Sequence, residues 1–151
     1  MKTSELTRFA LDWAVAQAEG VPVSLNGTLF DDKPLERDPW MAQHYPDNLC
    51  VYRTDEDEQM DEDGYEHFCT YNRPVYDPSS DWAIGGPIIE REWIEIVPWP
   101  NESDENLRWR ATQHDVPGVL SVTGPTPLIA AMRCYVASKL GDEVEVPEAL
   151  K

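Results

Sequence analysis

Hydrophobic residues recur three and four positions apart near both ends of the chain, a spacing that is typical of amphipathic helices. The first such pattern predicts a helix over about 3–19, capped by Thr3 or the serine after it and ended by Gly20. The second predicts a helix that begins after Thr126 and ends at Gly141. The apolar residues expected to pack these helices on a shared sheet are Leu6, Phe9, Trp13, Leu128, Met132 and Val136.

Shorter segments between the two helices have the character of strands. Residues 88–97 and 107–113 predict two antiparallel strands joined by a polar loop, and 119–122 predicts a third strand. Asn26-Gly27, between short apolar runs, predicts a hairpin turn. We therefore expect a single α+β domain over the whole chain, in which a small, mainly antiparallel sheet packs against the N- and C-terminal helices.

The central stretch YDPSSDWAIGGPIIEREW, residues 76–93, predicts a turn, an aromatic residue and a Gly-Gly-Pro hinge that leads into a strand. Its hydroxyls, backbone N–H groups, carboxylate and aromatic ring suit a small polar ligand. Two arginines expected nearby would hold a phosphate or carboxylate group. In the alternative, structural interpretation, Asp81 caps the turn, Trp82 lies in the core and the glycines form a bulge. The candidate ligand-binding residues are Ser79, Ser80, Asp81, Trp82, Gly85, Gly86, Arg91 and Arg133.

The most informative feature of the composition is its charge. The 151 residues are 41% hydrophobic, which argues against wholesale disorder, but their net charge is −17. Such a charge disfavours direct binding to nucleic acid or to anionic membranes, and it favours a basic protein, a cation or simply solubility. Three cysteines and no visible targeting or membrane segment indicate free thiols in a reducing cytoplasm.

Acidic residues are concentrated in two segments. Eight carboxylates lie between Asp55 and Glu66, and we expect a mobile loop at about 54–66. Aligned as an EF-hand, the run places Gln59 and Thr70 at two positions that require acidic ligands, so it does not fit that calcium site. Weak divalent-ion binding and contact with a basic partner remain alternatives for this run. The tail 142–151 is expected to be extended and acidic.

No reaction motif is evident. Ser79 and Ser80 lie outside a G-x-S-x-G frame, and the paired glycines lack the spacing of a dinucleotide or phosphate loop. His67 and Cys69, with Cys50, supply only one short-spaced ligand pair, whereas structural zinc requires four ligands. We therefore expect a non-enzymatic protein with no catalytic residue, no metal site and no cofactor.

Three blocks of the chain together resemble the NinX-like proteins of lambdoid phages and prophages: SELTRFALDWAVAQAEG, YDPSSDWAIGGPIIERE and GPTPLIAAMRCYVASKLGDEVEVP. Related sequences tend to read Tyr-Ser-Pro-Ser-Thr-Asp-Trp-Ala-Gln, where this chain has Asp77, Ser80 and Ile84. The region between Pro34 and Pro74 has no part in the resemblance. The family has no established activity to carry over, so the resemblance implies only a small accessory phage protein in the cytoplasm of a bacterial host.

Three classes of function follow from these features. The first is a non-enzymatic protein that binds a small polar or nucleotide-like ligand or a host factor, for example against host defence. The second is an acidic inhibitor that mimics DNA and occupies a basic surface of a host protein. The third is an uncharacterised enzyme. The sequence does not determine the oligomeric state.

Overall fold

The computed structural model describes residues 1–25, 51–53, 76–99, 103–104, 107–114 and 120–151. The chain divides into two compact units, one formed by Met1–Gly20 with Asp77–Lys151 and the other by Val21–Tyr76. Among the residues described, no helix is both long enough and apolar enough to span a bilayer.

In the smaller unit, β1 (Val23–Leu25) pairs with β2 (Val51–Arg53) in antiparallel register, with Ser24 opposite Tyr52. The predicted Asn26-Gly27 turn lies outside the described residues. The acidic run at 54–66 and the three residues considered for zinc also lie outside them, so these expectations stay predictions.

The described residues of the larger unit form three α-helices and a three-stranded antiparallel sheet, which confirms the α+β class. The sheet order is β3-β4-β5, and Ala111 in the middle strand lies opposite Ile96 and Val122. Its elements are η1 (Thr3–Glu5), α1 (Arg8–Glu19), α3 (Trp82–Arg91), β3 (Glu95–Pro98), β4 (Trp109–Gln113), β5 (Leu120–Gly124), α4 (Pro127–Leu140) and η3 (Glu148–Leu150).

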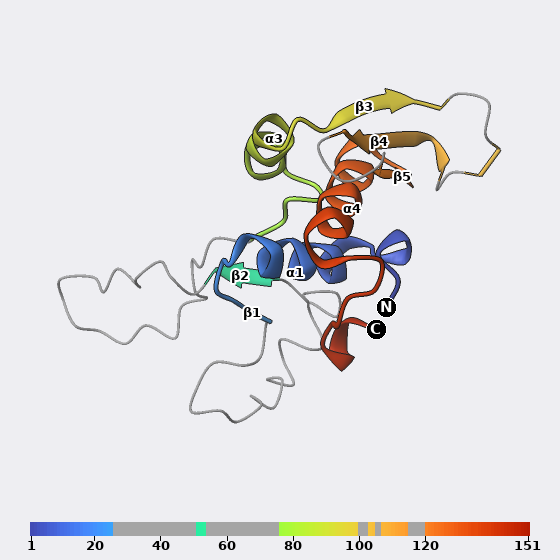
Figure 1. Cartoon of the computed structure of the whole chain (residues 1–151). Coiled ribbons are helices and arrows are strands. Elements are labelled where there is room, and N and C mark those ends of the chain that lie inside the picture. Colours follow the sequence, from blue (N-terminus) through green and yellow to red (C-terminus); the bar gives the residue numbers. More distant parts are fainter. Residues whose placement is uncertain (26–50, 54–75, 100–102, 105–106, 115–119) are drawn as a thin grey trace, which may run out of the picture. The chain divides into compact units, whose positions relative to one another are not determined.

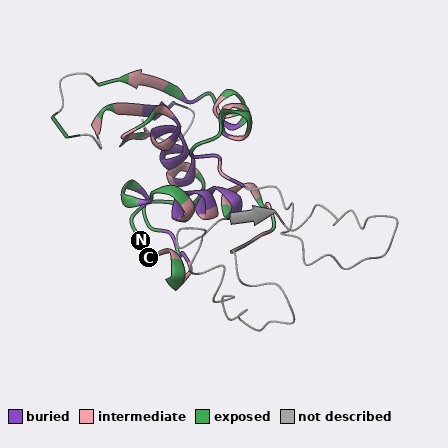
Figure 2. Ribbon diagram, turned by 180° about the vertical axis from the view of Figure 1, so that it is seen from behind, coloured by how far each residue is buried: buried purple, intermediate pink, exposed green. Residues whose placement is uncertain are grey.

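Helix α4 is the centre of this unit. Thr126 Oγ1 accepts a hydrogen bond from the Ile129 N–H at 3.2 Å and Pro127 opens the helix, as the sequence predicted. The helix lies between the sheet and α1 (Figure 1), and the buried residues are concentrated on α1 and α4 (Figure 2). The layers are thus sheet, α4 and α1, whereas the apolar stripes predicted that both terminal helices would pack directly on the sheet.

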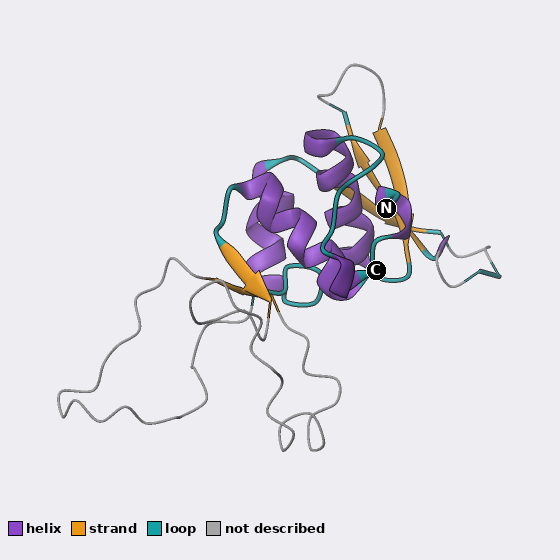
Figure 3. Cartoon of the chain, turned by 90° about the horizontal axis from the view of Figure 1, so that it is seen from below, coloured by secondary structure: helices purple, strands orange, loops and turns teal. Residues whose placement is uncertain are grey.

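The N-terminal helix begins later than predicted. Thr3 and its neighbours form the short η1, and α1 starts only at Arg8. Thr3 does not cap α1, because its hydroxyl donates to the Gly141 carbonyl at 2.7 Å and its N–H donates to the Asp142 carbonyl at 2.8 Å. The two ends of the chain therefore lie together (Figure 3), and the start of the predicted acidic tail is hydrogen-bonded to the N-terminus.

The central stretch differs most from its prediction. The expected Gly-Gly-Pro hinge lies inside α3, and the strand expected from residue 88 begins only at Glu95. Asp81 begins the helix, because its Oδ1 accepts a hydrogen bond from the Ala83 N–H at 2.8 Å. Pro87 removes one hydrogen bond, to the Ala83 carbonyl, on the exposed side of the helix, where water can replace it.

Candidate functional site

The predicted ligand turn is a compact hydrogen-bonded structure that leads into α3. The N–H groups of Ser80 and Asp81 both donate to the Asp77 carbonyl, at 3.0 and 2.9 Å. Ser79 is buried, and its N–H donates to Asp12 Oδ1 on α1 at 2.9 Å. Ser79 therefore anchors the turn to α1, and only Ser80 and Asp81 of the predicted turn residues are exposed.

The two glycines of α3 have different surroundings. A methyl group on Gly85 would lie 2.4 Å from the Pro78 carbonyl oxygen and 2.8 Å from Leu128 Cδ2. Gly85 thus permits the close approach of α3 to its own turn and to α4. A methyl group on Gly86 would meet only the Trp82 ring, at 3.9 Å, among the atoms described.

This difference predicts opposite effects for one substitution at neighbouring positions. Gly85→Ala is expected to lower the free energy of unfolding by about 1–2 kcal/mol, because the overpacking exceeds the gain in helix propensity. Gly86→Ala is expected to raise it by about 0.5–1 kcal/mol, since only the propensity changes. Denaturant titration of both variants is the measurement. Equal shifts of the same sign would contradict the packing role of Gly85.

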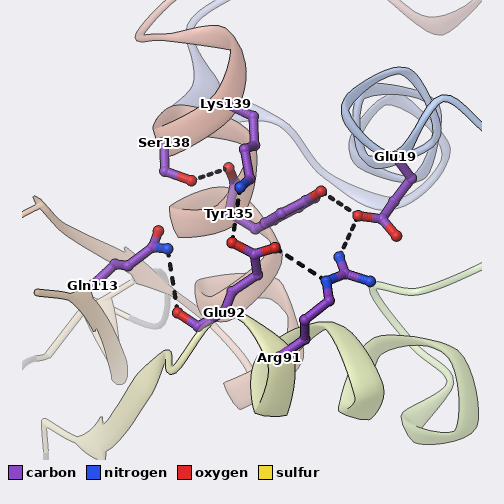
Figure 4. Close-up of polar contacts among 7 residues, drawn as sticks. All are labelled: Glu19, Arg91, Glu92, Gln113, Tyr135, Ser138 and Lys139. Carbon is purple, nitrogen blue, oxygen red and sulfur yellow. Dashed lines mark hydrogen bonds and ion pairs between the residues drawn. The ribbon is translucent and has the colours of Figure 1, made fainter. Parts of the chain in front are cut away.

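Arg91 lies at the far end of α3 from the turn, about 15 Å away at 1.5 Å per residue. Its guanidinium donates to Glu19 Oε1 at 2.5 Å and to Glu92 Oε1 at 3.1 Å (Figure 4), and the hydrogen bond to Glu19 is the main cause of its raised pKa. The expectation that Arg91 lies beside the turn was therefore wrong. It joins the end of α3 to α1.

The same cluster connects α3 to α4. Lys139 Nζ contacts Glu92 Oε2 at 2.9 Å, and the Tyr135 hydroxyl donates to Glu19 (Figure 4). Burial acts to raise the pKa of Glu92, but the hydrogen bonds from Lys139 and Arg91 outweigh it and lower the pKa. Burial, together with the Glu19 carboxylate, raises the pKa of Tyr135. The cluster is a structural junction of three helices.

Arg133 is also not at the turn. Its side chain is buried, at 3% exposure, with Nε donating to the Leu6 carbonyl at 2.8 Å and one terminal nitrogen to the Thr123 carbonyl at 2.9 Å. Burial lowers its pKa. The prediction of a second arginine beside the turn was therefore wrong, because this one holds the N-terminal segment and β5 to α4.

Asp12 is a buried carboxyl group that the sequence interpretation missed. It is 2% exposed, and burial raises its pKa to about 7, although the hydrogen bonds from Ser79 act in the opposite direction. The signal in the sequence was an acidic residue between Leu11 and Trp13, within the apolar part of the first helix. A buried carboxyl group of this kind is expected to make folding depend on pH.

Two tryptophans are exposed at opposite ends of α3: Trp82 at 54% and Trp93 at 80%. The alternative that places Trp82 in the core is therefore wrong. Trp93 has a left-handed backbone, with φ of 53°. Its N–H donates to the Glu90 carbonyl at 3.4 Å, and the next N–H, of Ile94, donates to the Ile89 carbonyl at 3.1 Å. This is a Schellman motif with tryptophan at the position that glycine usually occupies.

Seven residues of α3 and its ends, all exposed except the half-buried Gly86, define what we call the α3 surface. Its charged members, Asp81 and Glu90, are acidic, and the neighbouring Arg91 is exposed but paired with Glu19 and Glu92. The described part of the chain holds no group of three His, Cys, Asp or Glu side chains able to bind a metal ion. The surface consists of Asp81, Trp82, Ala83, Gly86, Pro87, Glu90 and Trp93.

The chain is similar to a known protein family over most of its length. The family model described as Bacteriophage P22, NinX matches residues 2–139. No curated protein matches the chain significantly. The match runs from before α1 to the last turn of α4, which confirms the resemblance seen in the three sequence blocks. The chain therefore belongs to the NinX family, and it is a phage accessory protein.

Proposed function

We propose that this phage protein is a non-enzymatic binding protein that acts in the host cytoplasm by attaching to a host protein through the α3 surface. The observation that carries the proposal is the exposure of Trp82 and Trp93, at 54% and 80%. Tryptophan is usually largely buried in folded proteins, and it is enriched among the residues that dominate protein–protein binding.

Trp93 adds a second argument. A bulky residue in the left-handed region destabilises the backbone by about 1–2 kcal/mol, and glycine would avoid this cost. Because little of its ring is buried, packing within the described residues offers small compensation. A partner that covers the ring supplies a reason for tryptophan at this position.

The charges support a protein partner over a nucleotide-like ligand. Arg91 is held by Glu19 and Glu92, and Arg133 is buried against backbone carbonyls, so neither is placed to neutralise a phosphate at the turn. The α3 surface instead presents the carboxylates of Asp81 and Glu90, which complement lysine or arginine.

The proposal predicts that Trp93→Gly separates binding from stability. Immobilised protein incubated with host lysate should retain a specific host protein, identified by mass spectrometry. Trp93→Gly should reduce that capture at least tenfold, a loss of about 1.4 kcal/mol or more. Its free energy of unfolding should be unchanged or higher by about 1 kcal/mol, because the left-handed strain is relieved.

Arg8→Gly is the matched control. Arg8 is also exposed and also has a left-handed backbone, with φ of 43°, but it lies at the start of α1. The Arg8→Gly variant should capture the same host protein as the parent does. Equal capture by Trp93→Gly and the parent would contradict the proposal, as would loss of capture by Arg8→Gly as well.

An acidic inhibitor that mimics DNA is the second candidate, favoured by the excess of 29 acidic over 12 basic residues. In that case duplex DNA should compete with this protein for the captured partner. Because the partner binds DNA more weakly as the salt concentration rises, the competition by DNA should weaken to the same degree. A captured partner that DNA does not displace would exclude this second candidate and leave the first.

A further inference from the structure

Trp82 begins a row of positions along one side of α3, and Trp93 lies just past the other end of the helix. Trp82, Gly86 and Glu90 are four residues apart, and Trp93 follows three residues later. Helical spacing places Trp82, Gly86 and Glu90 on the same side of α3, whereas Trp93 lies past the end of the helix with a left-handed backbone. From Trp82 to its last residue, Arg91, the helix is about 14 Å long, whereas a helix with its side chains is about 10 Å wide.

The surface between the tryptophans lacks long apolar side chains. Ala83, Gly86 and Pro87 supply its floor, and Ala83 and Pro87 are exposed. Gly86 weakens the helix relative to alanine, yet a methyl group there would meet only the Trp82 ring among the described atoms, at an ordinary contact distance of 3.9 Å. Unlike Gly85, it is therefore not required by packing among the described residues of this unit.

Acidic side chains border this floor. Asp81 lies at one end and Glu90 along the row, and both are exposed. The cation that follows, Arg91, is held by Glu19 and Glu92. A partner that covers the floor therefore meets carboxylates whose complement is lysine or arginine.

We propose that the α3 surface accepts a basic amphipathic helix of the partner, which crosses α3 over Gly86 between Trp82 and Trp93. This inference rests on the proposed function, since it names the chemistry and shape of the partner. The apolar face of the incoming helix packs against the two indole rings, and its basic side chains reach Asp81 and Glu90. Gly86 allows the two helix axes to approach closely.

The test uses three designed 18-residue peptides with the same number of leucines: a lysine-rich helix, a glutamate-rich helix and a lysine-rich sequence with prolines that prevent a helix. Each is titrated into the full-length ¹⁵N-labelled protein. The lysine-rich helix should bind saturably, with amide shifts centred on residues 81–93. The other two should bind at least tenfold more weakly.

Gly86→Leu should weaken binding of the lysine-rich helix at least tenfold, because its side chain fills the crossing point. Gly86→Ala keeps the surface nearly flat and should change the dissociation constant less than threefold. Glu90→Gln should weaken binding and reduce its salt dependence. Thermal melting of each variant confirms that the fold is retained.

Several results would overturn the helix proposal. One is the absence of saturable binding below about 1 mM, a dissociation constant that corresponds to about 4 kcal/mol of binding free energy. The others are amide shifts spread over the whole acidic surface and tighter binding of the proline-containing peptide than of the lysine-rich helix. Indifference to Gly86→Leu would also overturn it. If lysate capture still depends on Trp93 in that case, the proposed function stands and only the helical partner fails.

Discussion

Arg133→Met is expected to lower the free energy of unfolding by about 2–4 kcal/mol, because it leaves two carbonyl groups without their donors. The arginine is 3% exposed and donates to the carbonyls of Leu6 and Thr123 at 2.8 and 2.9 Å. These bonds join α4 to the N-terminal segment and to β5. Methionine matches the length of the aliphatic stem but has no N–H group, so the loss reports mainly on hydrogen bonding.

Lys139→Met on the same helix is the control. The Lys139 side chain is 41% exposed and pairs with Glu92, so its removal should change the free energy of unfolding by less than about 1 kcal/mol. Guanidinium chloride titrations should show that the free energy of unfolding depends on denaturant concentration with the same slope in both variants as in the parent. A loss of less than about 1 kcal/mol for Arg133→Met would remove the arginine from the set of structural residues.

Asp12→Asn is expected to raise the free energy of unfolding at pH 8 by about 2–4 kcal/mol and to change it at pH 4 by less than about 1 kcal/mol. The pKa of the buried carboxyl group is raised to about 7 in the folded protein, mainly by burial. In the unfolded chain it is expected near 3.9. Asparagine carries no charge and retains an oxygen that can accept the Ser79 N–H.

The direction of the pH dependence follows from these two pKa values. Below about pH 4 the carboxyl group is protonated in both states, and its stabilising effect is fully present. Between pH 4 and 7 the unfolded state loses the proton first, so stability falls by about 1.4 kcal/mol per pH unit. Above pH 7 both states are ionised and the loss is complete.

Asp81→Asn is the control that distinguishes the effect of the buried Asp12 carboxyl group from the effect of removing one negative charge elsewhere. Asp81 is exposed, and asparagine caps helices about as well as aspartate, so that variant should differ from the parent by less than about 0.5 kcal/mol at both pH values. Urea titrations from pH 4 to 8 measure all three proteins. If the free energy of unfolding depended on pH in the same way in Asp12→Asn and in the parent, the Asp12 carboxyl group would not have the raised pKa that its burial requires.

The helix that forms the centre of the fold could be predicted because its signals are local. Thr126, Pro127 and Gly141 lie at its two ends, and its apolar residues follow helical spacing. The strand at 107–113 was predicted from local alternation, and 119–122 was predicted as a third strand. The structure has strands at Trp109–Gln113 and Leu120–Gly124, although their burial does not alternate strictly. What the pattern could not show is that α4 would separate α1 from the sheet.

Helix α3 was not predicted because its residues are poor helix formers in isolation. Gly85, Gly86 and Pro87 break helices in most contexts, and the helix ends at tryptophan where glycine is usual. Two features support it nonetheless: the Asp81 cap and the close packing that Gly85 allows against Pro78 and Leu128. Only the first of these is visible in the sequence.

The positions of the two arginines relative to the turn could not be predicted for a related reason. The turn, Trp82 and the two arginines were grouped because their chemistry is complementary, but the fold places Arg91 at the far end of α3 and buries Arg133. Helical spacing puts Arg133 near the edge of an apolar stripe, and whether that edge faces solvent depends on the neighbouring elements. Ligand binding at the turn itself stays a prediction.

Local sequence was therefore sufficient for the α+β class, the two terminal helices and the acidic character, because capping, periodicity and charge are properties of neighbouring residues. The family followed from the resemblance of three sequence blocks, which the family match confirms. Tertiary structure decided that α3 is a helix, that Asp12 and Arg133 are buried, and that Trp82 and Trp93 are exposed. Each of these depends on contacts between segments far apart in the chain, such as Asp12 with Ser79 and Arg133 with Leu6. Burial and partner are set by those distant segments, so no local pattern could assign them.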